Sequence, residues 1–402
     1  MGGAREYPMV IGIVCEYNPF HNGHLHQLRR SREAAGEDTT VVCVLSGDFV
    51  QRGEASPWTK FARAEAACRC GADLVAELPL PWCLSSAEGF ARGAVGLLAA
   101  LGARRLSFGS ESGDAEGVKT LAALLREPAF TESVKRRLRE NPALSFAAAR
   151  QLEAEARLGA AGALLGQPND ILAVEYAKAV QSLEPNMELF AVKRLGSGHD
   201  RPGTGEGYPS ASALRGLFAA GERLEGRIPP EAAGVLGAQP RIDPERLETA
   251  LLSRLRLLDA SAFDALPDAA NGLGKRLCRA VREQGSLAEI HAAAATKRYP
   301  TARIRRALLC ACLGITDGLA AGIPPYARIL AANARGREHL RRLADSALVP
   351  VLTKPATVKT LDARSAALFT LGAAAHDLYV LGYPDPELRR PGEDWRRSPV
   401  MV

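Results

Sequence analysis

The sequence predicts a doubly wound, parallel-sheet α/β domain followed by a mainly helical second half. Three observations support this prediction. In the first half, short apolar runs bounded by Gly, Asp or Pro alternate with stretches of helical periodicity. Between residues 108 and 188 this alternation stops, and only helical patterns remain. From Ser210 onward the pattern is again helical and rich in Leu, Ala and Arg.

The apolar runs fit parallel strands that are buried on both faces. The helical stretches between them fit the crossovers that such strands require, and ligands of such sheets bind at the carboxyl ends of the strands. The predicted strands are Met9–Cys15, Thr40–Leu45, Leu74–Glu77, Arg105–Phe108 and Glu188–Val192; the predicted crossover helices include Leu25–Ala35, Lys60–Cys70 and Ala87–Leu101.

Four more helices are predicted where the strand spacing breaks, and they form a helical insertion at about 112–185. The expected organisation is a disordered lead-in at 1–8, a first domain at 9–225, a mainly helical basic domain at 226–382 and an irregular tail at 383–402. The predicted helices of the insertion are Ala115–Leu125, Thr131–Glu140, Ser145–Leu158 and Pro168–Gln181.

Composition is that of an ordinary globular protein, with 47% hydrophobic and 24% charged residues among 402. No apolar run has the length of a membrane span, and the start has no apolar signal-peptide core, so we expect a cytoplasmic protein that does not bind membranes. The eight cysteines include no C-x-x-C pair. They are therefore expected to be reduced, apolar side chains, without a structural metal.

Charge is distributed unevenly along the chain. Residues 221–402 hold 27 Lys and Arg against 20 Asp and Glu, whereas residues 1–220 hold 24 against 25. A basic second half is typical of a domain that binds a polyanion. The alternative is an arginine-rich solvated surface, and charge alone does not separate the two.

The most informative motif is His21-Asn22-Gly23-His24, which follows the first strand and opens the first helix. The first amides of a helix lack intrahelical partners and lie at the positive end of its dipole, so this turn predicts a phosphate site. His21 and His24 are three residues apart and both face it. His26 lies on another face of the helix.

A second segment, Ser46–Glu54, begins where the second strand ends. This position places Asp48 above the predicted cleft, and Lys60 is a candidate phosphate ligand. A solvated helix face is the alternative for Lys60 and the preferred interpretation for Arg63.

Three further segments follow later strands or open helices. Gly109 ends the fourth strand, where a base or ribose can approach the backbone, although a plain turn also explains it. Asn169 is either a ligand of the nucleotide or a helix cap. Arg194 ends the last strand, and Ser212 and Arg215 at a helix start suit pyrophosphate, although a cap explains Ser210 or Ser212.

The last segment, residues 297–306, carries five basic residues around one tyrosine. It suits phosphate contacts, with Tyr299 stacking on a base; a charged helix face is the alternative. The candidate RNA-binding residues are Lys297, Arg298, Tyr299, Arg303, Arg305 and Arg306.

The H-x-G-H turn resembles the signature of the nucleotidyltransferase superfamily. The full series of motifs is similar to a narrower group, the tRNA(Met) cytidine acetate ligase family, over most of residues 9–326 and more loosely to Tyr379. The motifs are, in order, EYNPFHNGH, SGDFVQRGE, GADLVAELP, SAEGFA, FGSE, PNDIL, VKR, SASALR and KRYPTARIRR.

This resemblance implies a Rossmann-like nucleotidyltransferase domain and a two-step ligase. ATP and acetate would form acetyl-adenylate, and the acetyl group would pass to N4 of the wobble cytidine of elongator tRNA(Met). Mg²⁺ is expected with ATP. The resemblance also implies an ATP site made of Ile13, Val14, Cys15, Glu16, Tyr17, Asn18, Pro19, Phe20, His21, Asn22, Gly23, His24, Leu25, His26, Gly109, Asn169 and Arg194.

Acetate is a weak nucleophile, so the α-phosphate and the leaving pyrophosphate must be neutralised. The catalytic candidates for this role are His21, His24 and Lys60, with Arg194. Asp48 is a candidate for orienting or deprotonating the cytidine amine. The alternatives are a small-molecule adenylyltransferase acting on a cofactor precursor, or a protein that binds ATP and tRNA without catalysis.

Overall fold

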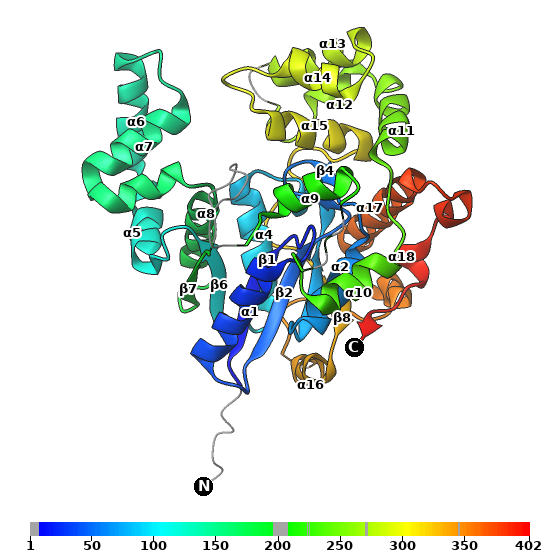
Figure 1. Ribbon diagram of the computed structural model, residues 1–402. Helices are drawn as coiled ribbons and strands as arrows, with labels where there is room; N and C mark the ends of the chain where they lie inside the picture. Colours follow the sequence, from blue (N-terminus) through cyan, green and yellow to red (C-terminus); the bar gives the residue numbers. More distant parts are fainter. Residues whose placement is uncertain (1–7, 196–207, 223, 225, 270–271, 345) are drawn as a thin grey trace.

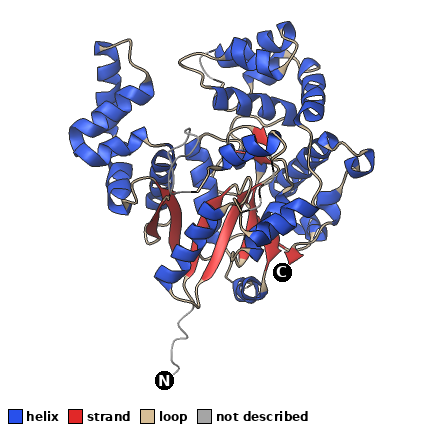
Figure 2. Cartoon of the chain, in the orientation of Figure 1, coloured by secondary structure: helices blue, strands red, loops and turns tan. Residues whose placement is uncertain are grey.

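The computed structural model describes residues 8–195, 208–222, 224, 226–269, 272–344 and 346–402. A mostly parallel sheet lies at its centre, with helices on both faces (Figures 1 and 2). The strands are β1 (Val10–Cys15), β2 (Thr40–Ser46), β3 (Phe49–Val50), β4 (Glu54–Ala55), β5 (Leu74–Leu78), β6 (Arg105–Ser110), β7 (Glu188–Lys193), β8 (Ala327–Ala332), β9 (Val351–Leu352) and β10 (Val400–Met401).

The five strands predicted in the first half are all present and all parallel, in the order β5-β2-β1-β6-β7. Val14 of β1 pairs with Val44 of β2, and Ile13 pairs with Ser107 of β6. From β1 the chain runs outward through β2 and β5, and then returns to add β6 and β7 on the other side. The switch point, where such sheets bind their ligands, therefore lies between β1 and β6. The predicted doubly wound fold is confirmed.

Both faces of the sheet are buried, as the apolar runs indicated. Along β2, Val42 and Val44 belong to one core, whereas Val41 and Cys43 belong to the other. The helices that cover the two faces include α4 (Ala87–Ala100) and α8 (Pro168–Leu183) on one side, and α1 (Asn22–Ala35) and α2 (Lys60–Arg69) on the other. Gly12 allows close packing of α4, because a Cβ there would lie 2.8 Å from Leu98 Cδ1.

The helices predicted between residues 108 and 188 are present and project from one side of the sheet (Figure 1). They are α5 (Ala115–Leu125), α6 (Pro128–Glu140), α7 (Phe146–Leu158) and α8, with a 3₁₀ segment at Gly159–Gly166. Helix α8 packs on α4 and α5 and so ties this insertion to the domain.

A second group of helices forms a helical lobe, which we define as α11–α15. Its core includes Leu251, Leu277 and Ile304, and it continues into residues outside the lobe such as Phe49 and Tyr379. Its helices are α11 (Pro244–Arg256), α12 (Ala260–Asp264), α13 (Leu273–Glu283), α14 (Leu287–Ala294) and α15 (Thr301–Leu313); α9 (Ala211–Ala219) and α10 (Pro230–Ala238) precede it, and the short α3 (Leu80–Cys83) lies in the first half. In Figure 1 the lobe and the insertion rise from the same end of the sheet.

After the lobe, the chain returns to the sheet, which differs from the expected division of the sequence. Strand β8 pairs antiparallel with β5, and β9 and β10 pair with β8. A six-residue apolar run such as β8 cannot be told from a buried helical segment by periodicity, so the sequence analysis assigned it to the helical domain. The remaining elements are α16 (Ala334–Leu343), α17 (Ala363–Tyr379), α18 (Glu393–Arg396) and 3₁₀ segments at Pro355–Thr360, Val380–Gly382 and Pro386–Arg389.

The tail at 383–402 is also not irregular throughout. It contains α18 and β10, and Asp394 within α18 is 0% exposed. Long-range strand pairing and ion pairs order this segment, and neither leaves a local pattern in the sequence. The expected lead-in at 1–8 falls almost wholly outside the described residues. Within the described ranges, no helix combines the length and hydropathy that crossing a membrane requires.

Candidate active site

His21 and His24 form a closed pair at the start of α1. His21 is the N-cap, and its Nδ1 accepts a hydrogen bond from the Gly23 N–H at 3.0 Å. The backbone N–H of His21 donates to Nδ1 of His24 at 3.2 Å, and the two rings stack with centroids 3.7 Å apart. A Cβ on Gly23 would lie 2.9 Å from His21 Cε1, so glycine permits this cap. The Gly23 amide expected to meet a phosphate is therefore occupied by a ring nitrogen.

These hydrogen bonds fix the tautomer of both rings. A backbone N–H can only donate, so each Nδ1 accepts and carries no proton. Burial, together with the charge of Arg194, lowers the pKa of His21 to about 3. Burial and the neighbouring His21 and Arg194 charges lower the pKa of His24 well below its ordinary value. Both rings are neutral near pH 7, so the pair offers two Nε2–H donors, not two positive charges.

Arg194 and Gly109 lie beside this pair at the switch point. Strands β6 and β7 are paired, and a Cβ on Gly109 would lie 3.6 Å from both Cγ and Nη1 of Arg194. The Arg194 charge also contributes to the lowered pKa of both histidines. Groups from the ends of β1, β6 and β7 are thus brought together, as the sequence predicted.

Asn169 is attached to the same strand end through Glu111. Its Nδ2 donates to Glu111 Oε1 at 2.5 Å, and Glu111 also accepts the backbone N–H groups of Asn169 and Asp170 at 3.2 and 3.0 Å. The Ser110 hydroxyl contacts the Asp170 carboxylate and fixes the start of α8 further. The cap of α8 therefore comes from the end of β6, and Asn169 is held near Gly109.

The other residues of the predicted ATP segment divide by burial. Ile13, Cys15, Tyr17 and Phe20 are in the core, and the rings of Tyr17 and Phe20 pack against His24 with centroids 4.8 and 5.6 Å apart. The Tyr17 and Phe20 rings therefore pack the histidine pair against the hydrophobic core. Asn18 and Pro19 are also buried, whereas Val14, Glu16, Asn22, Gly23, His24, Leu25 and His26 are half-buried.

Arg63 was expected on a solvated helix face, and this prediction was wrong. Its side chain is 0% exposed. Its Nη1 donates to the Glu16 carbonyl at 2.6 Å, its Nη2 to the carbonyls of Ser46 at 3.1 Å and Gly47, and its Nε to the Trp58 carbonyl at 3.2 Å. One guanidinium thus joins the loops that follow β1 and β2.

Ser212 and Arg215 lie on α9, whose N-cap is Ser210. The Ser210 hydroxyl accepts the Ala213 N–H at 3.2 Å and contacts the Ser212 hydroxyl at 3.0 Å, so the capping alternative explains Ser210. Arg215 Nη1 donates to the Asn18 carbonyl at 2.8 Å. This contact fixes α9 against the loop that leads to His21.

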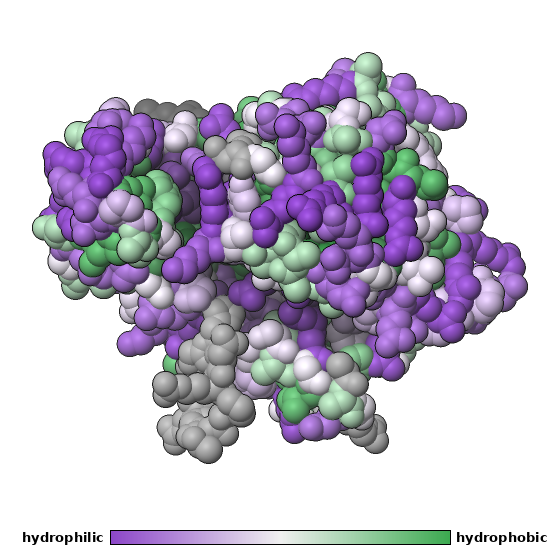
Figure 3. All heavy atoms as spheres, turned by 90° about the horizontal axis from the view of Figure 1, so that it is seen from above, coloured by the Kyte–Doolittle hydropathy of each residue, from purple (hydrophilic) through white to green (hydrophobic). Residues whose placement is uncertain are grey.

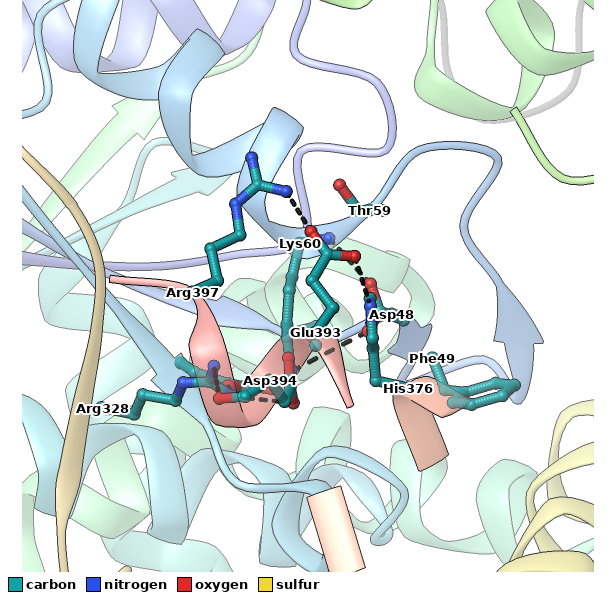
Figure 4. Close-up of polar contacts among 12 residues, drawn as sticks. Asp48, Phe49, Thr59, Lys60, Arg328, His376, Glu393, Asp394 and Arg397 are labelled. Atoms are coloured by element: carbon teal, nitrogen blue, oxygen red, sulfur yellow. Dashed lines mark hydrogen bonds and ion pairs between the residues drawn. The ribbon is translucent and has the colours of Figure 1, made fainter. Parts of the chain in front are cut away.

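Lys60 and Asp48 belong to a buried ion cluster (Figure 4). Lys60 Nζ lies 2.8 Å from Glu77 Oε1 and 2.6 Å from Asp394 Oδ2. Asp48 accepts the backbone N–H of Lys60 at 2.8 Å and lies 2.8 Å from His376 Nδ1. The members of the buried ion cluster are Asp48, Lys60, Glu77, Arg328, His376, Glu393, Asp394 and Arg397.

This setting does not fit the roles that the sequence analysis gave to the two residues. The Lys60 side chain is 1% exposed, and carboxylates already surround its ammonium. Burial would raise the pKa of Asp48, but the charges of His376 and Lys60 outweigh it and hold that pKa below its usual range. A covered carboxylate with a lowered pKa is a poor base. Both residues are therefore corrected to structural roles.

The partners of Lys60 and Asp48 were not predicted from the sequence. His376 on α17 and the pair Glu393 and Asp394 on α18 lie in segments assigned to the helical domain and the tail. A lone histidine and two acids near prolines carry no local signal. Arg328 is the residue from which a buried ion cluster could have been predicted, because an arginine inside the apolar run of β8 requires a buried acidic partner.

Tyr299 and Arg303 are less accessible than the RNA-binding prediction requires. The Tyr299 side chain is 7% exposed, and the Arg303 guanidinium lies over its ring at 5.4 Å from the centroid. Arg303 also donates to the Asp268 carbonyl. The Tyr299 ring is part of the lobe core and is not a platform for a base.

Arg305 and Arg306 connect the helical lobe to the first domain. Arg305 is paired with Glu54, and Arg306 Nη1 donates to the Gln51 carbonyl at 3.3 Å. A Cβ on Gly53 would lie 2.5 Å from the Arg306 backbone nitrogen, so α15 is packed directly on the β3–β4 hairpin. Of the six RNA-binding candidates, Lys297 and Arg298 are exposed.

Among the described residues, no His, Cys, Asp and Glu side chains form a group of three or more suited to a metal ion. All eight cysteines are buried free thiols. Burial raises the pKa of the Cys310 and Cys312 thiols to about 12, which keeps them protonated and unreactive.

Known proteins are similar to this chain over most of its length. The family model described as HIGH Nucleotidyl Transferase matches residues 9–394. The curated tRNA(Met) cytidine acetate ligase of Syntrophotalea carbinolica is 38% identical over 354 residues, which cover 85% of this chain and 84% of that protein. The corresponding protein of Syntrophomonas wolfei is 33% identical and covers 97% of this chain and 99% of its own.

Solved structures of one protein are similar to this chain in fold. The apo crystal structure of Thermotoga maritima TmcAL superposes with a TM-score of 0.89 at 30% identity, covering 98% of this chain and 99% of that chain. A second structure of that protein, bound with alpha-thio ATP, gives a TM-score of 0.88 at 29% identity. With its parallel sheet and its capped histidine pair, the chain belongs to the tRNA(Met) cytidine acetate ligase family, a group of HIGH-type nucleotidyltransferases.

Proposed function

We propose that this protein forms acetyl-adenylate from ATP and acetate and then acetylates N4 of the wobble cytidine of elongator tRNA(Met). The observation that carries the proposal is the neutral histidine pair beside Arg194 at the switch point of the sheet. The names of the curated relatives and the ATP analogue bound to the Thermotoga protein support it.

In the first step, a carboxylate oxygen of acetate attacks the α-phosphorus. A new phosphorus–oxygen bond forms, and the bond to the bridging oxygen of pyrophosphate breaks. His21 and His24 donate from Nε2 to phosphoryl oxygens, and Arg194 supplies the positive charge. Donors that are fixed before the reaction stabilise the developing charge without reorganising, so the stacking and capping of the two rings serve this step directly.

In the second step, the cytidine amine attacks the acetyl carbonyl, and AMP leaves with the electron pair of the broken bond. N4 loses one proton in this step. Because Lys60 and His376 enclose the Asp48 carboxylate, that proton passes to water or to the departing phosphate and not to Asp48.

Mg²⁺ is proposed to arrive with ATP as the counter-ion of the phosphates. The ATP site is proposed to comprise the segment from Ile13 to His26 with Gly109, Asn169 and Arg194, and the tRNA is proposed to contact the helical lobe. Ser212 and Arg215 remain candidate pyrophosphate residues, since α9 is fixed to the loop before His21.

The test is incubation of the purified protein with ATP and radiolabelled acetate, with or without elongator tRNA(Met). Acetate-dependent pyrophosphate release with label recovered as N4-acetylcytidine is the expected result. Release without label in tRNA would reject the acceptor. Pyrophosphate release that ignores acetate but responds to nicotinamide mononucleotide or phosphopantetheine would indicate a cofactor adenylyltransferase instead.

A further inference from the structure

Helix α13 presents a strongly basic face on the outside of the helical lobe. Its apolar residues, among them Leu273, Leu277 and Val281, are buried in the lobe core. Its charged residues are on the opposite side and are all exposed: Lys275, Arg276, Arg279, Arg282 and Glu283. This single helix therefore exposes four positive charges and one negative charge.

The two exposed basic residues of the predicted RNA-binding segment, Lys297 and Arg298, lie near this helix in the chain. Arg276 Nε and Nη2 donate to the carbonyls of Ala294 and Ala293 at 3.0 Å each, at the end of α14. Lys297 and Arg298 follow within four residues and are exposed. We call these six basic residues the α13 surface: Lys275, Arg276, Arg279, Arg282, Lys297 and Arg298.

The arrangement of charges on the α13 surface suits a row of phosphates. Lys275, Arg279 and Arg282 have the spacing i, i+4, i+7, which places them on one side of the helix over about 10 Å. Two exposed acids lie nearby: Asp264 lines the same hollow as Lys275, Arg279 and Arg282, and Glu283 pairs with Arg279 at 2.8 Å, with side chains 77% and 51% exposed. An exposed pair of this kind is weak, so a phosphate can replace the carboxylate at little cost.

We propose that the α13 surface binds the phosphate backbone of the tRNA substrate. This inference rests on the proposed function. A membrane surface is a poorer partner, because the apolar side of α13 is already buried and cannot insert into lipid. Arginines along a helix provide donors to phosphate that do not depend on base sequence.

The position of the lobe agrees with this partner. The lobe rises from the end of the sheet at which α1 begins (Figure 1), and hydrophilic side chains cover much of its surface when viewed from that end (Figure 3). A tRNA held along α13 would therefore lie at the end of the molecule where β1 and β6 have their carboxyl ends. Arg305 and Arg306 of α15, which were predicted to bind RNA, instead contact Glu54 and Gln51 of the first domain.

The test compares Arg279→Gln/Arg282→Gln with a matched control, Arg341→Gln/Arg342→Gln. Arg341 pairs with Glu338 at 2.8 Å, with side chains 72% and 47% exposed, so its environment resembles that of Arg279. Helix α16 carries the control pair and lies at the opposite end of the molecule in Figure 1. Both variants lose two exposed positive charges.

The dissociation constant for an elongator tRNA(Met) transcript is measured by filter binding between about 50 and 200 mM KCl. The α13 variant is expected to bind about tenfold more weakly, and the slope of log K against log salt is expected to fall by about 1 for each lost contact. The control is expected to keep the wild-type slope. The thermal shift produced by ATP is expected to be the same in all three proteins.

Equal affinity and equal salt dependence in the α13 variant and the wild type would overturn the inference. So would a variant that loses binding to vesicles of anionic phospholipid but keeps its affinity for tRNA. Failure of the proposed function is a separate result. If the wild-type protein binds tRNA through α13 but transfers no acetate, the proposed reaction is refuted and the α13 surface remains a tRNA-binding site.

Discussion

Lys60 Nζ lies 2.6 Å from Oδ2 of Asp394. A lysine of α2, the helix that connects β2 to β5, is therefore neutralised by an acid near the end of the chain. Both side chains are buried, and Arg328 contacts the same carboxylate at 2.7 Å. One acid shared by two buried cations holds α18 against the sheet. The end of the chain is thereby part of the first domain.

Asp394→Asn removes this charge while keeping the shape of the side chain. Because it leaves two buried cations with less compensation, it is expected to lower the free energy of unfolding by about 3–5 kcal/mol. Urea denaturation measures the change. Glu387→Gln is the control, since Glu387 pairs with Arg390 at 74% exposure and its loss is expected to cost under about 0.5 kcal/mol. Similar losses in both variants would contradict this account of the cluster.

His376 is expected to make stability depend on alkaline pH. Burial alone would lower its pKa, but the charge of the Asp48 carboxylate and the hydrogen bonds that His376 donates to Asp48 and Glu393 raise the pKa of His376 to about 10. Its unfolded value is about 6.5. Since the folded form holds the proton more tightly, the stabilisation is complete below about pH 6.5 and is lost as pH rises through about 10.

The measurement for His376 is the free energy of unfolding from pH 6 to 10 in the wild type, His376→Gln and His26→Gln. The His376 variant is expected to be less stable and to show a flatter decline toward pH 10. His26 is half-buried on α1 and outside the cluster, so its variant is expected to follow the wild-type curve. Parallel curves for all three proteins would refute the proposed protonation of His376.

Replacing His24 with alanine removes one of the two Nε2–H donors. Loss of one such donor costs about 10²–10³-fold in turnover when it stabilises developing charge. Acetate-dependent pyrophosphate release is expected to fall by that factor, with a smaller change in the dissociation constant of ATP. Arg30→Ala, on the same helix but exposed and outside the proposed ATP segment, is the control and is expected to keep most of the activity. A His24 variant with near wild-type turnover would remove the histidine pair from the mechanism.

Arg63→Lys tests whether the buried guanidinium organises the loops after β1 and β2. Lysine offers a point charge without the planar fork of arginine, so carbonyls such as those of Glu16 and Ser46 lose their donors. A loss of about 1–3 kcal/mol in stability for each orphaned carbonyl, and weaker ATP binding, are expected. Arg69→Lys, at the exposed end of α2, serves as the control. Denaturation and ATP titration that fail to separate the two variants would count against this role.

Tyr299→Ala distinguishes a core residue from a base-stacking residue. Because the ring is buried in the lobe, its removal is expected to destabilise the protein by about 3–5 kcal/mol. Lys297→Ala, two residues earlier and exposed, is expected to leave stability unchanged and to weaken tRNA binding. Thermal melts and tRNA titrations of both variants make the comparison. A stable Tyr299 variant that binds tRNA poorly would restore the stacking interpretation.

Local signals in the sequence were sufficient for the first half of the fold. Buried parallel strands are short apolar runs, and the H-x-G-H turn lies where a strand passes into a helix, so β1, β6 and β7 and their site residues could be placed by strand-end geometry alone. Gly109 and Arg194 lie side by side because they end the paired strands β6 and β7, and β6 also pairs with β1, which leads to the histidines. The same reasoning failed for Lys60, since position at a helix start does not reveal which charges face it.

By itself, the sequence determined the doubly wound sheet, the histidine turn and the family, because these depend on periodicity and on motifs of adjacent residues. Tertiary structure alone decided the return of β8 and β10 to the sheet, the burial of Arg63 and Tyr299, and the pairing of Lys60 with Asp394. The physical reason is that a charge becomes structural or functional according to what surrounds it in space. Those surroundings come from residues far away in the chain, about which local sequence carries no information.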